Sequence, residues 1–474
     1  MQRISHPWKV TLVVLVGVFV ASLDLFIVNI AFPAIARNFR GSSLAGLSWV
    51  LNAYAILFAA LLVPAGRWSD RAGRRRGFIG GLAVFVTASA ACALAPSVAV
   101  LVAARAIQAV GAAFMLPTSL GLLLPEFPPE RRAGVIGLWA AVGGVAAAAG
   151  PPIGGLLVQA SWRWVFIVNV PIGLITLVAA VRVLSERREP AGPRPDVLGA
   201  GLIAAAIGAL TFAIVKAPDW GWGSVRVVTL FVATALLLAG LVRRSQVHEA
   251  PVIEPELIRD RAIALANLGA LLFFAGFAAM LLASVLFLTG VWHESVLRAG
   301  LEVAPGPATA ALFAVPGGLL GNRFGQRVVG TAGTLLFAAG GLWWHAHLGA
   351  TPRFASDYLP GMMIGGAGVG LVLPTLSAAA TAPLPPARFA TGSAILTMSR
   401  QVGSALGVAI LVAIVGAPGR GPGPFDHAWL FMTCSALAAG ATISMLGPVR
   451  LHRPVTSEVI APTALEGQIG RAAG

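Results

Sequence analysis

Residues 66–75, GRWSDRAGRR, recur in altered form 252 residues further along the chain as residues 318–327, GLLGNRFGQR. Two Gly and two Arg positions are identical in the copies, and Asp70 of the first copy corresponds to Asn322 of the second. Each copy directly follows a long apolar segment. The chain is therefore predicted to contain two related halves, with this loop at an equivalent place in each.

The composition predicts that lipid surrounds most of this chain. Of its 474 residues, 57% are hydrophobic and 11% are charged, whereas a soluble protein has about 25% charged residues. The formal net charge of +15 does not indicate a nucleic-acid-binding protein. The basic residues form no tract or face but lie in short clusters between apolar runs, as they do in membrane proteins.

Fourteen apolar segments are long enough to cross a bilayer, which takes roughly 20 residues as a helix. Because lipid cannot satisfy backbone polar groups, each segment is expected to be helical. The segments span about 10–32, 46–66, 77–97, 100–123, 133–158, 163–183, 197–216, 225–242, 262–290, 299–320, 328–349, 358–382, 389–416 and 428–448.

The two copies of the repeat follow spans 2 and 10, so two spans lie inserted between equivalent six-helix halves. The predicted fold is an all-α integral membrane protein with two six-helix halves, two inserted helices and 14 transmembrane helices. We expect an N-terminal half at 1–190, inserted helices and a linker at 191–260, a C-terminal half at 261–450 and a disordered cytoplasmic tail at 451–474. Parallel repeats of this kind are typical of transporters whose halves rock around a central site.

The distribution of basic residues predicts the orientation. With the N-terminus in the cytoplasm, 23 of the 33 Lys and Arg residues fall in cytoplasmic segments and 8 in outer segments, while Arg105 and Arg400 lie within spans. This bias predicts that both termini are cytoplasmic. All but two of the basic residues are Arg, and Ala, Gly and Pro are abundant, which is typical of high-GC bacterial coding and favours a bacterial inner membrane.

The energy source is expected to be an ion gradient. A phosphate-binding P-loop needs a Lys within a Gly-rich turn, and the two lysines, Lys9 and Lys216, lack such glycines. The two cysteines, Cys92 and Cys434, have no metal-ligand spacing. The sequence therefore predicts a protein that is not an enzyme and needs no cofactor or metal.

Asp24, near the middle of the first span, is the main candidate for proton coupling together with Arg105 in the fourth span. An ionisable group inside a bilayer is costly, by roughly 3 kcal/mol or more, and so points to function. Burial makes the charged carboxylate costly, so Asp24 could bind and release a proton. The alternatives are a purely structural Asp24–Arg105 partnership and an Arg105 that reaches toward the membrane surface.

A substrate cavity is expected to be lined by polar and aromatic side chains of spans 1, 2, 4, 5 and 13. The candidates are Asn29, Trp49, Asn52, Tyr54, Gln108, Met115, Trp139 and Arg400. Core packing is the alternative for the aromatic residues, and for Arg400 it is an interaction with helix dipoles near the cytoplasmic side. His345 and His347, beside Trp343 and Trp344, fit a membrane-interface belt better than a proton relay.

Two further motifs predict moving parts. The loop after span 2 is interpreted as a gate built from Gly66, Asp70, Arg71, Gly73, Arg74 and Arg75, with charges that could pair across the halves. Span 5 is interpreted as a hinge or leak seal at Gly150, Pro151, Gly154 and Gly155. Ordinary cytoplasmic charge and generic helix packing are the respective alternatives.

Together these motifs resemble the major facilitator superfamily, specifically its fourteen-span drug:proton antiporter family, over essentially the whole chain. Residues 66–76 resemble the superfamily's cytoplasmic loop signature, and residues 101–111 resemble the span 4 motif linked to proton coupling. Residues 144–155 resemble the antiporter motif of span 5, and residues 23–33, 162–173 and 295–327 resemble family sequence in spans 1, 6 and 10. Ala109 and Asn322 depart from the family pattern, because Gly and Asp are usual there.

The resemblance implies proton-driven export of small lipophilic compounds across the inner membrane. The expected partners are protons, one lipophilic substrate and membrane lipid, with no nucleic acid, and the chain is expected to be monomeric. Span 13 carries Arg400 and no acid, so monocationic, neutral or anionic substrates are favoured over dicationic ones. An exporter dedicated to one metabolite, a proton-symport importer and a membrane sensor or lipid-handling scaffold are the alternatives.

Overall fold

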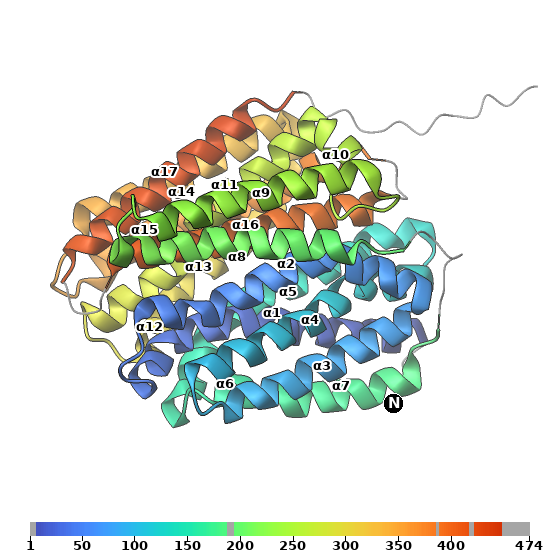
Figure 1. The fold of residues 1–474 in the computed structure, drawn as a ribbon, viewed down its shortest axis with the longest axis horizontal. Helices are drawn as coiled ribbons and strands as arrows, with labels where there is room; N and C mark the ends of the chain where they lie inside the picture. The colour runs from blue at the N-terminus through green and yellow to red at the C-terminus, as the bar shows by residue number, and fades with distance from the viewer. Residues whose placement is uncertain (1–5, 187–193, 385–387, 417–420, 448–474) are drawn as a thin grey trace, which may run out of the picture.

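A computed structural model describes residues 6–186, 194–384, 388–416 and 421–447, and in these ranges all regular structure is helical (Figure 1). The first part of the chain forms α1 His6–Asn38, α2 Leu44–Ala72, α3 Arg74–Leu94, α4 Val98–Leu123, α5 Pro129–Ala160, α6 Trp164–Ile167 and α7 Asn169–Val183. Two long helices follow, α8 Val197–Trp220 and α9 Val225–Val247, and then the short α10 Pro255–Arg259. The last part forms α11 Arg261–Gly290, α12 Val296–Val303, α13 Pro305–Phe324, α14 Gln326–His347, α15 Leu359–Thr381, α16 Phe389–Val415 and α17 Gly423–Ser444.

Within the described residues, 12 helical segments are long and apolar enough to cross a membrane, two fewer than the sequence predicted. The two that fall short are α14 and α17, although each has 22 residues. Both helices carry polar positions that pack inside the protein, such as Thr334 and Thr433. A helix that faces other helices can hold such residues at less cost than one that faces lipid.

Two predicted spans each consist of two helical segments joined by one residue whose own backbone angles are helical. The sixth span consists of α6 and α7, which meet at Val168, and the tenth consists of α12 and α13, which meet at Ala304. Pro305 begins α13, and because Pro lacks an N–H, it fits the start of a helix without the loss of a backbone hydrogen bond. The predicted tail at 451–474 lies outside the described residues.

The internal repeat is confirmed by backbone geometry. Gly73 joins α2 to α3 with φ 119°, and Gly325 joins α13 to α14 with φ 92°. Glycine adopts positive φ at no steric cost, which lets one helix end and the next begin within a single residue. The packing repeats as well, since α4 packs against α2 and α3 while α15 packs against α13 and α14.

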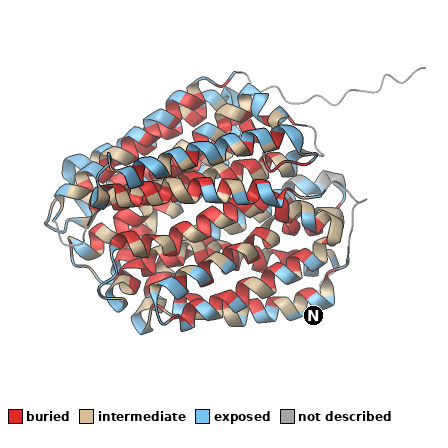
Figure 2. Ribbon diagram, viewed as in Figure 1, coloured by how far each residue is buried: buried red, intermediate tan, exposed pale blue. Residues whose placement is uncertain are grey.

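The helices group into two bundles that touch along shared faces. Helices α1 to α7 pack among themselves, as do α11 to α17, and between the groups α2 packs on α16 and α5 packs on α12. Helix α8 packs against both α2 and α16, while α9 packs on α8. Figure 2 shows α9 as largely exposed, whereas the central helices are mostly buried. The inserted helices therefore cover one seam between the two groups.

The two groups interlock at one end of α5. A Cβ atom at Gly155 would lie 2.9 Å from the Leu297 Cα of α12, and a Cβ at Gly300 would meet the Pro151 carbonyl oxygen. Gly134, near the other end of α5, and Gly144, at its middle, have no atom within 4 Å of the corresponding position. Glycine is thus required where α5 meets α12, and open space lies beside the opposite end.

Candidate functional site

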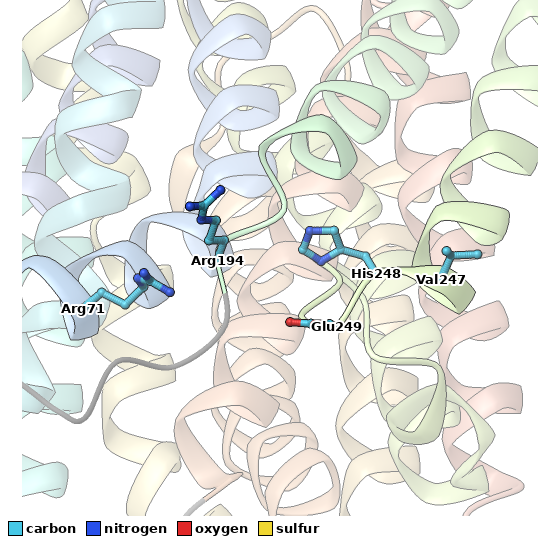
Figure 3. Close-up of a pocket in the computed structure, with 5 residues that line it drawn as sticks. All are labelled: Arg71, Arg194, Val247, His248 and Glu249. Atoms are coloured by element: carbon cyan, nitrogen blue, oxygen red, sulfur yellow. The ribbon is translucent and has the colours of Figure 1, made fainter.

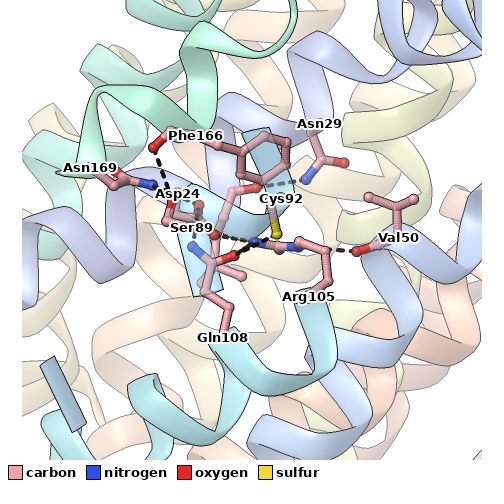
Figure 4. Close-up of polar contacts among 10 residues, drawn as sticks. Asp24, Asn29, Val50, Ser89, Cys92, Arg105, Gln108, Phe166 and Asn169 are labelled. Atoms are coloured by element: carbon pink, nitrogen blue, oxygen red, sulfur yellow. Dashed lines mark hydrogen bonds and ion pairs between the residues drawn. The ribbon is translucent and has the colours of Figure 1, made fainter. Parts of the chain in front are cut away.

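Asp24 is fully buried near the middle of α1, where it is held by three other side chains (Figure 4). Arg105 of α4 donates a hydrogen bond to Asp24 Oδ2 and forms an ion pair with it. Asp24 Oδ1 accepts hydrogen bonds from Gln108 Nε2 and from Asn169 Nδ2, each 3.0 Å long. Both carboxylate oxygens are therefore satisfied by donors from other helices.

Helix geometry places these donors together. Arg105 and Gln108 are three residues apart on α4, so they share a face of that helix, and Arg105 Nη1 also donates to Gln108 Oε1 at 2.7 Å. Asn169 is the first residue of α7, and its amide nitrogen also donates to Ser89 Oγ of α3 at 3.1 Å. One polar network thus links α1, α3, α4 and α7.

Arg105 makes further contacts that fix its guanidinium group. Its Nε donates to the Val50 carbonyl oxygen of α2 at 3.2 Å, and its Cζ lies 4.2 Å from the centre of the Tyr54 ring. A guanidinium over an aromatic face gains a cation–π attraction that is larger when the pair is desolvated. These contacts hold the cation in a position that only a negative Asp24 balances.

The charge balance of this network depends on the Asp24 carboxylate. A protonated Asp24 is neutral, so Arg105 would then be left as an uncompensated charge in a buried site. Such a charge is strongly destabilising unless it finds another partner or water. Proton binding at Asp24 would therefore favour a different arrangement of the helices that this network joins.

Three other predicted cavity residues lie on α1, α2 and α4, outside the hydrogen bonds of this network. Asn29, one turn beyond Leu25 on α1, donates to the Leu25 carbonyl oxygen. Asn52 is fully buried on α2, and neither atom of its amide has a hydrogen-bond partner. Met115 is also fully buried, and its methyl group lies beside Gly17 of α1, which places it in the packed core.

The remaining predicted cavity residues lie apart from Asp24. Trp49 packs against Phe212 of the inserted helix α8, with ring centres 6.1 Å apart. Trp139 of α5 donates to Ser119 Oγ at 2.9 Å. Arg400 lies on α16 in the other group of helices, with its Cζ 4.4 Å from the centre of the Phe274 ring.

The predicted gate loop is anchored mainly within its own half. Asp70 pairs with Arg74 at 2.7 Å, and Arg74 also donates to the Gly121 carbonyl oxygen. Arg75 donates to the Val181 carbonyl oxygen at 2.8 Å. The contacts described for Asp70, Arg74 and Arg75 join helices of the N-terminal group, and pairing across the two halves stays a prediction.

The packing of the loop explains two of its glycines. Gly66 lies against Pro117 of α4, where a Cβ would be 3.3 Å from the proline Cβ. Gly73 combines positive φ with a close approach of the Glu186 carboxylate. Arg67 connects the loop to a later segment, because it pairs with Glu254 at 2.6 Å.

The predicted hinge residues form a contact surface of α5. Helix α5 continues through Pro151 to Ala160. Gly150 lies against Phe26 of α1, and Gly154 lies within 3.2 Å of the Ile27 Cα when a Cβ is placed there. These residues bring α5 close to the helix that carries Asp24.

The predicted belt histidines lie at the end of α14. His345 and His347 are exposed. The His347 ring stacks on Trp343 with ring centres 4.0 Å apart. Neither histidine contacts the Asp24 network.

A cavity of about 420 Å³ lies where α2 and α9 end and α8 begins. Its α2 residue, Arg71, lies 17 positions further along the helix than Tyr54. Figure 3 shows its lining residues, which are Arg71, Arg194, Val247, His248 and Glu249. The gate residue Arg71 therefore faces the inserted helices. In the ranges that the structure describes, no group of three or more His, Cys, Asp or Glu side chains is arranged to hold a metal ion.

Sequence reasoning missed Asn169 and Ser89 as members of the site. Both are polar and fully buried, and each stands alone within an apolar run, which was the available signal. Ser89 Oγ also donates to the Phe166 carbonyl oxygen at 2.9 Å, just where α6 gives way to α7. Ser89 therefore links the junction of α6 and α7 to the Asn169 side chain that reaches Asp24.

The long apolar helices, the repeated halves and a buried ion pair at the centre of one half define a multi-pass membrane protein of the transporter class. A family model described as Major Facilitator Superfamily matches residues 14–242. The chain is 35% identical to the tetracenomycin C resistance and export protein of Streptomyces glaucescens, over 87% of this chain and 77% of the relative. It is 34% identical to the multidrug resistance protein Stp of Mycobacterium tuberculosis, over 85% of this chain and 74% of that relative.

The fold is also similar to a solved structure. An auto-inhibited POT family peptide transporter superposes with a TM-score of 0.68 at 16% identity, covering 94% of this chain and 99% of that one. The chain belongs to the Major Facilitator Superfamily. Its curated relatives include antibiotic and multidrug resistance proteins.

Proposed function

We propose that this protein is a proton-coupled antiporter that exports small lipophilic compounds across the bacterial inner membrane. The observation that carries the proposal is the buried Asp24–Arg105 pair. Among the described residues, Asp24 is the one carboxyl group near the middle of a long helix, since the others lie in loops or near helix ends. Resistance and export relatives support outward movement of the substrate.

The proposed topology has fourteen spans with both termini in the cytoplasm. Helices α14 and α17 then count as spans because each has 22 residues and packs beside long apolar helices. In this orientation the interlocked ends of α5 and α12 face outward, and the open space beside Gly134 and Gly144 faces the cytoplasm. Such an arrangement is ready to accept a compound from the cytoplasm.

The proposed cycle uses one charge change. When Asp24 is ionised, it holds Arg105, Gln108 and Asn169 together. When a proton from outside neutralises Asp24, the network loosens and the two halves rearrange. Each unit charge that returns across 100 mV releases about 2.3 kcal/mol, enough for roughly a fortyfold gradient of an exported compound.

The test is pH-driven transport by the purified protein in proteoliposomes. The probes are ethidium as a lipophilic cation, Nile red as a neutral dye and 1-pyrenebutyrate as a lipophilic anion. We expect at least one probe to accumulate only when a pH gradient is imposed, and an ionophore that dissipates the gradient should abolish accumulation. Accumulation that is unchanged by the ionophore, or no movement of any probe by folded protein, would contradict proton-driven export.

A second candidate is an exporter dedicated to one compound. It is favoured by the description of the Streptomyces relative, which names a single antibiotic. Competition among the three probes separates the candidates. A multidrug exporter should transport more than one of them, each inhibiting the others, whereas a dedicated exporter should transport at most one.

A further inference from the structure

One face of α16 carries a stripe of polar side chains. The residues recur with helical spacing and are Ser393, Thr397, Arg400, Gln401 and Ser404. All five are partly accessible, whereas neighbours on the flanking faces, such as Met398 and Val402, are buried. Residues spaced by three and four lie on one side of a helix, so this stripe borders a space that is not filled by protein.

Protein surrounds α16 on several sides. Helix α16 packs against α2, α8, α11, α15 and α17. Gly403 and Gly407 contact the backbone of α11, while Ile395 and Met398 belong to the cluster shared with α2. The polar stripe lies between these two faces, on the side turned toward the N-terminal helices. A stripe of this polarity would be costly against lipid.

Arg400 has no charged partner within this space. Among the residues that the structure describes, no acidic side chain pairs with Arg400 and none of its guanidinium nitrogens donates a hydrogen bond. Its guanidinium group lies over the Phe274 ring. Asp24 cannot serve as the partner, since Arg105 already balances it.

The neighbour of Arg400 offers a second unused donor. Gln401 Nε2 is enclosed and has no hydrogen-bond partner. A buried donor without an acceptor destabilises a protein by about 1–3 kcal/mol. Two adjacent donors without acceptors therefore call for a ligand that brings acceptor atoms and negative charge.

The surface beside these donors is aromatic. Phe274 covers one face of the guanidinium, and its ring centre lies 5.5 Å from that of Phe277, which is partly accessible. A guanidinium binds a carboxylate through parallel N–H donors at its edge, and an aromatic ring on its face leaves that edge available. The site thus combines a fixed cation with an apolar wall.

We propose that Arg400 binds the anionic group of a lipophilic organic acid, with Gln401 as a second donor and the Phe274–Phe277 rings against the apolar body. The proposal rests on the proposed export function, because it names the substrate class of that transporter. It places the substrate anion in the C-terminal group of helices and the proton site in the N-terminal group. Substrate and proton would then act on different halves.

The test is equilibrium binding of two fluorescent probes that differ only in the head group, 1-pyrenebutyrate and 1-pyrenebutanol. Wild-type protein is expected to bind the carboxylate about 10- to 100-fold more tightly than the alcohol, as for hydrogen bonds to charged groups. Arg400→Gln should remove this preference and Arg400→Lys should keep part of it. Arg388→Gln is the control, since Arg388 lies at the start of the same helix, exposed and paired with Glu256.

Equal affinities of the wild type for both probes, or a preference that persists in Arg400→Gln, would overturn the site. Thermal unfolding of the substrate-free protein gives a second test. Removal of an unpaired cation should leave the unfolding temperature unchanged or raise it, so a fall of several degrees in Arg400→Gln would mean a structural partner and overturn the proposal. Binding needs no gradient, so a failure of pH-driven transport with the carboxylate preference intact would reject the antiporter and retain the site.

Discussion

Replacement of Asp24 by Asn should destabilise this protein more than any other isosteric change in its helices. The two carboxylate oxygens have different hydrogen-bond partners. Oδ1 accepts hydrogen bonds from Gln108 and Asn169, and Oδ2 accepts one from Arg105. An Asn carbonyl at the Oδ1 position can still accept the two amide donors. Its NH₂ group would then face the Arg105 guanidinium, donor against donor.

The magnitude follows from burial of the pair. The side chains of Arg105 and Asp24 are 1% and 0% exposed, so water cannot compensate for a lost partner. Removal of one member of a buried ion pair typically destabilises a protein by about 3–5 kcal/mol. Replacement of both members by uncharged residues often leaves the free energy of unfolding nearly unchanged. We therefore expect a loss of about 3–5 kcal/mol for Asp24→Asn and a smaller loss when Arg105→Gln is added.

The assay is equilibrium unfolding of the purified protein in detergent for the wild type, both single variants and the double variant. The double variant should be more stable than either single variant while remaining unable to couple transport to protons. A double variant whose loss equals the sum of the two single losses would refute the reasoning, because it would show that the two charges do not balance each other.

Two further outcomes follow from the packing of glycines. Gly300→Ala should lower transport, because its Cβ would collide with the Pro151 carbonyl oxygen at the α5–α12 contact, and overpacking costs about 1–3 kcal/mol. Gly144→Ala is the matched control, since that position faces open space. An equal loss of transport in both variants would contradict the close contact between α5 and α12. Gly73→Ala and Gly325→Ala should each lower the free energy of unfolding by about 1–3 kcal/mol, because both positions have positive φ. Unfolding temperatures equal to that of the wild type would show that these loops do not need glycine.

The arrangement of the repeat could be predicted from sequence because it depends on local chemistry. A glycine with charged neighbours after an apolar run predicts a tight turn, and the copies at Gly73 and Gly325 have matching backbone geometry. The number of spans was harder to predict. Helices α14 and α17 are packed among other helices. Their buried polar residues lower the mean hydropathy of each helix but do not face lipid, so they cost little free energy.

The Asp24 site was predicted only in part. Intramembrane charge singled out Asp24 and Arg105, since each stands alone in an apolar run. Asn169 escaped notice because a neutral amide carries a weaker signal, and its approach to Asp24 depends on the packing of α7 against α1. Trp49, which is predicted to line a cavity, contacts the inserted helix α8, and no spacing within α2 reveals which helix covers that face.

The central claim is that Asp24 couples proton movement to export. The most direct measurement is the pH change inside proteoliposomes when a transported probe is added without any other driving force, for the wild type, Asp24→Asn and Asp219→Asn. Asp219 is an exposed carboxylate paired with Lys216 near the end of α8 and serves as the control. We predict probe-dependent proton movement in the wild type and Asp219→Asn and none in Asp24→Asn, whereas undiminished proton movement in folded Asp24→Asn protein would contradict the account.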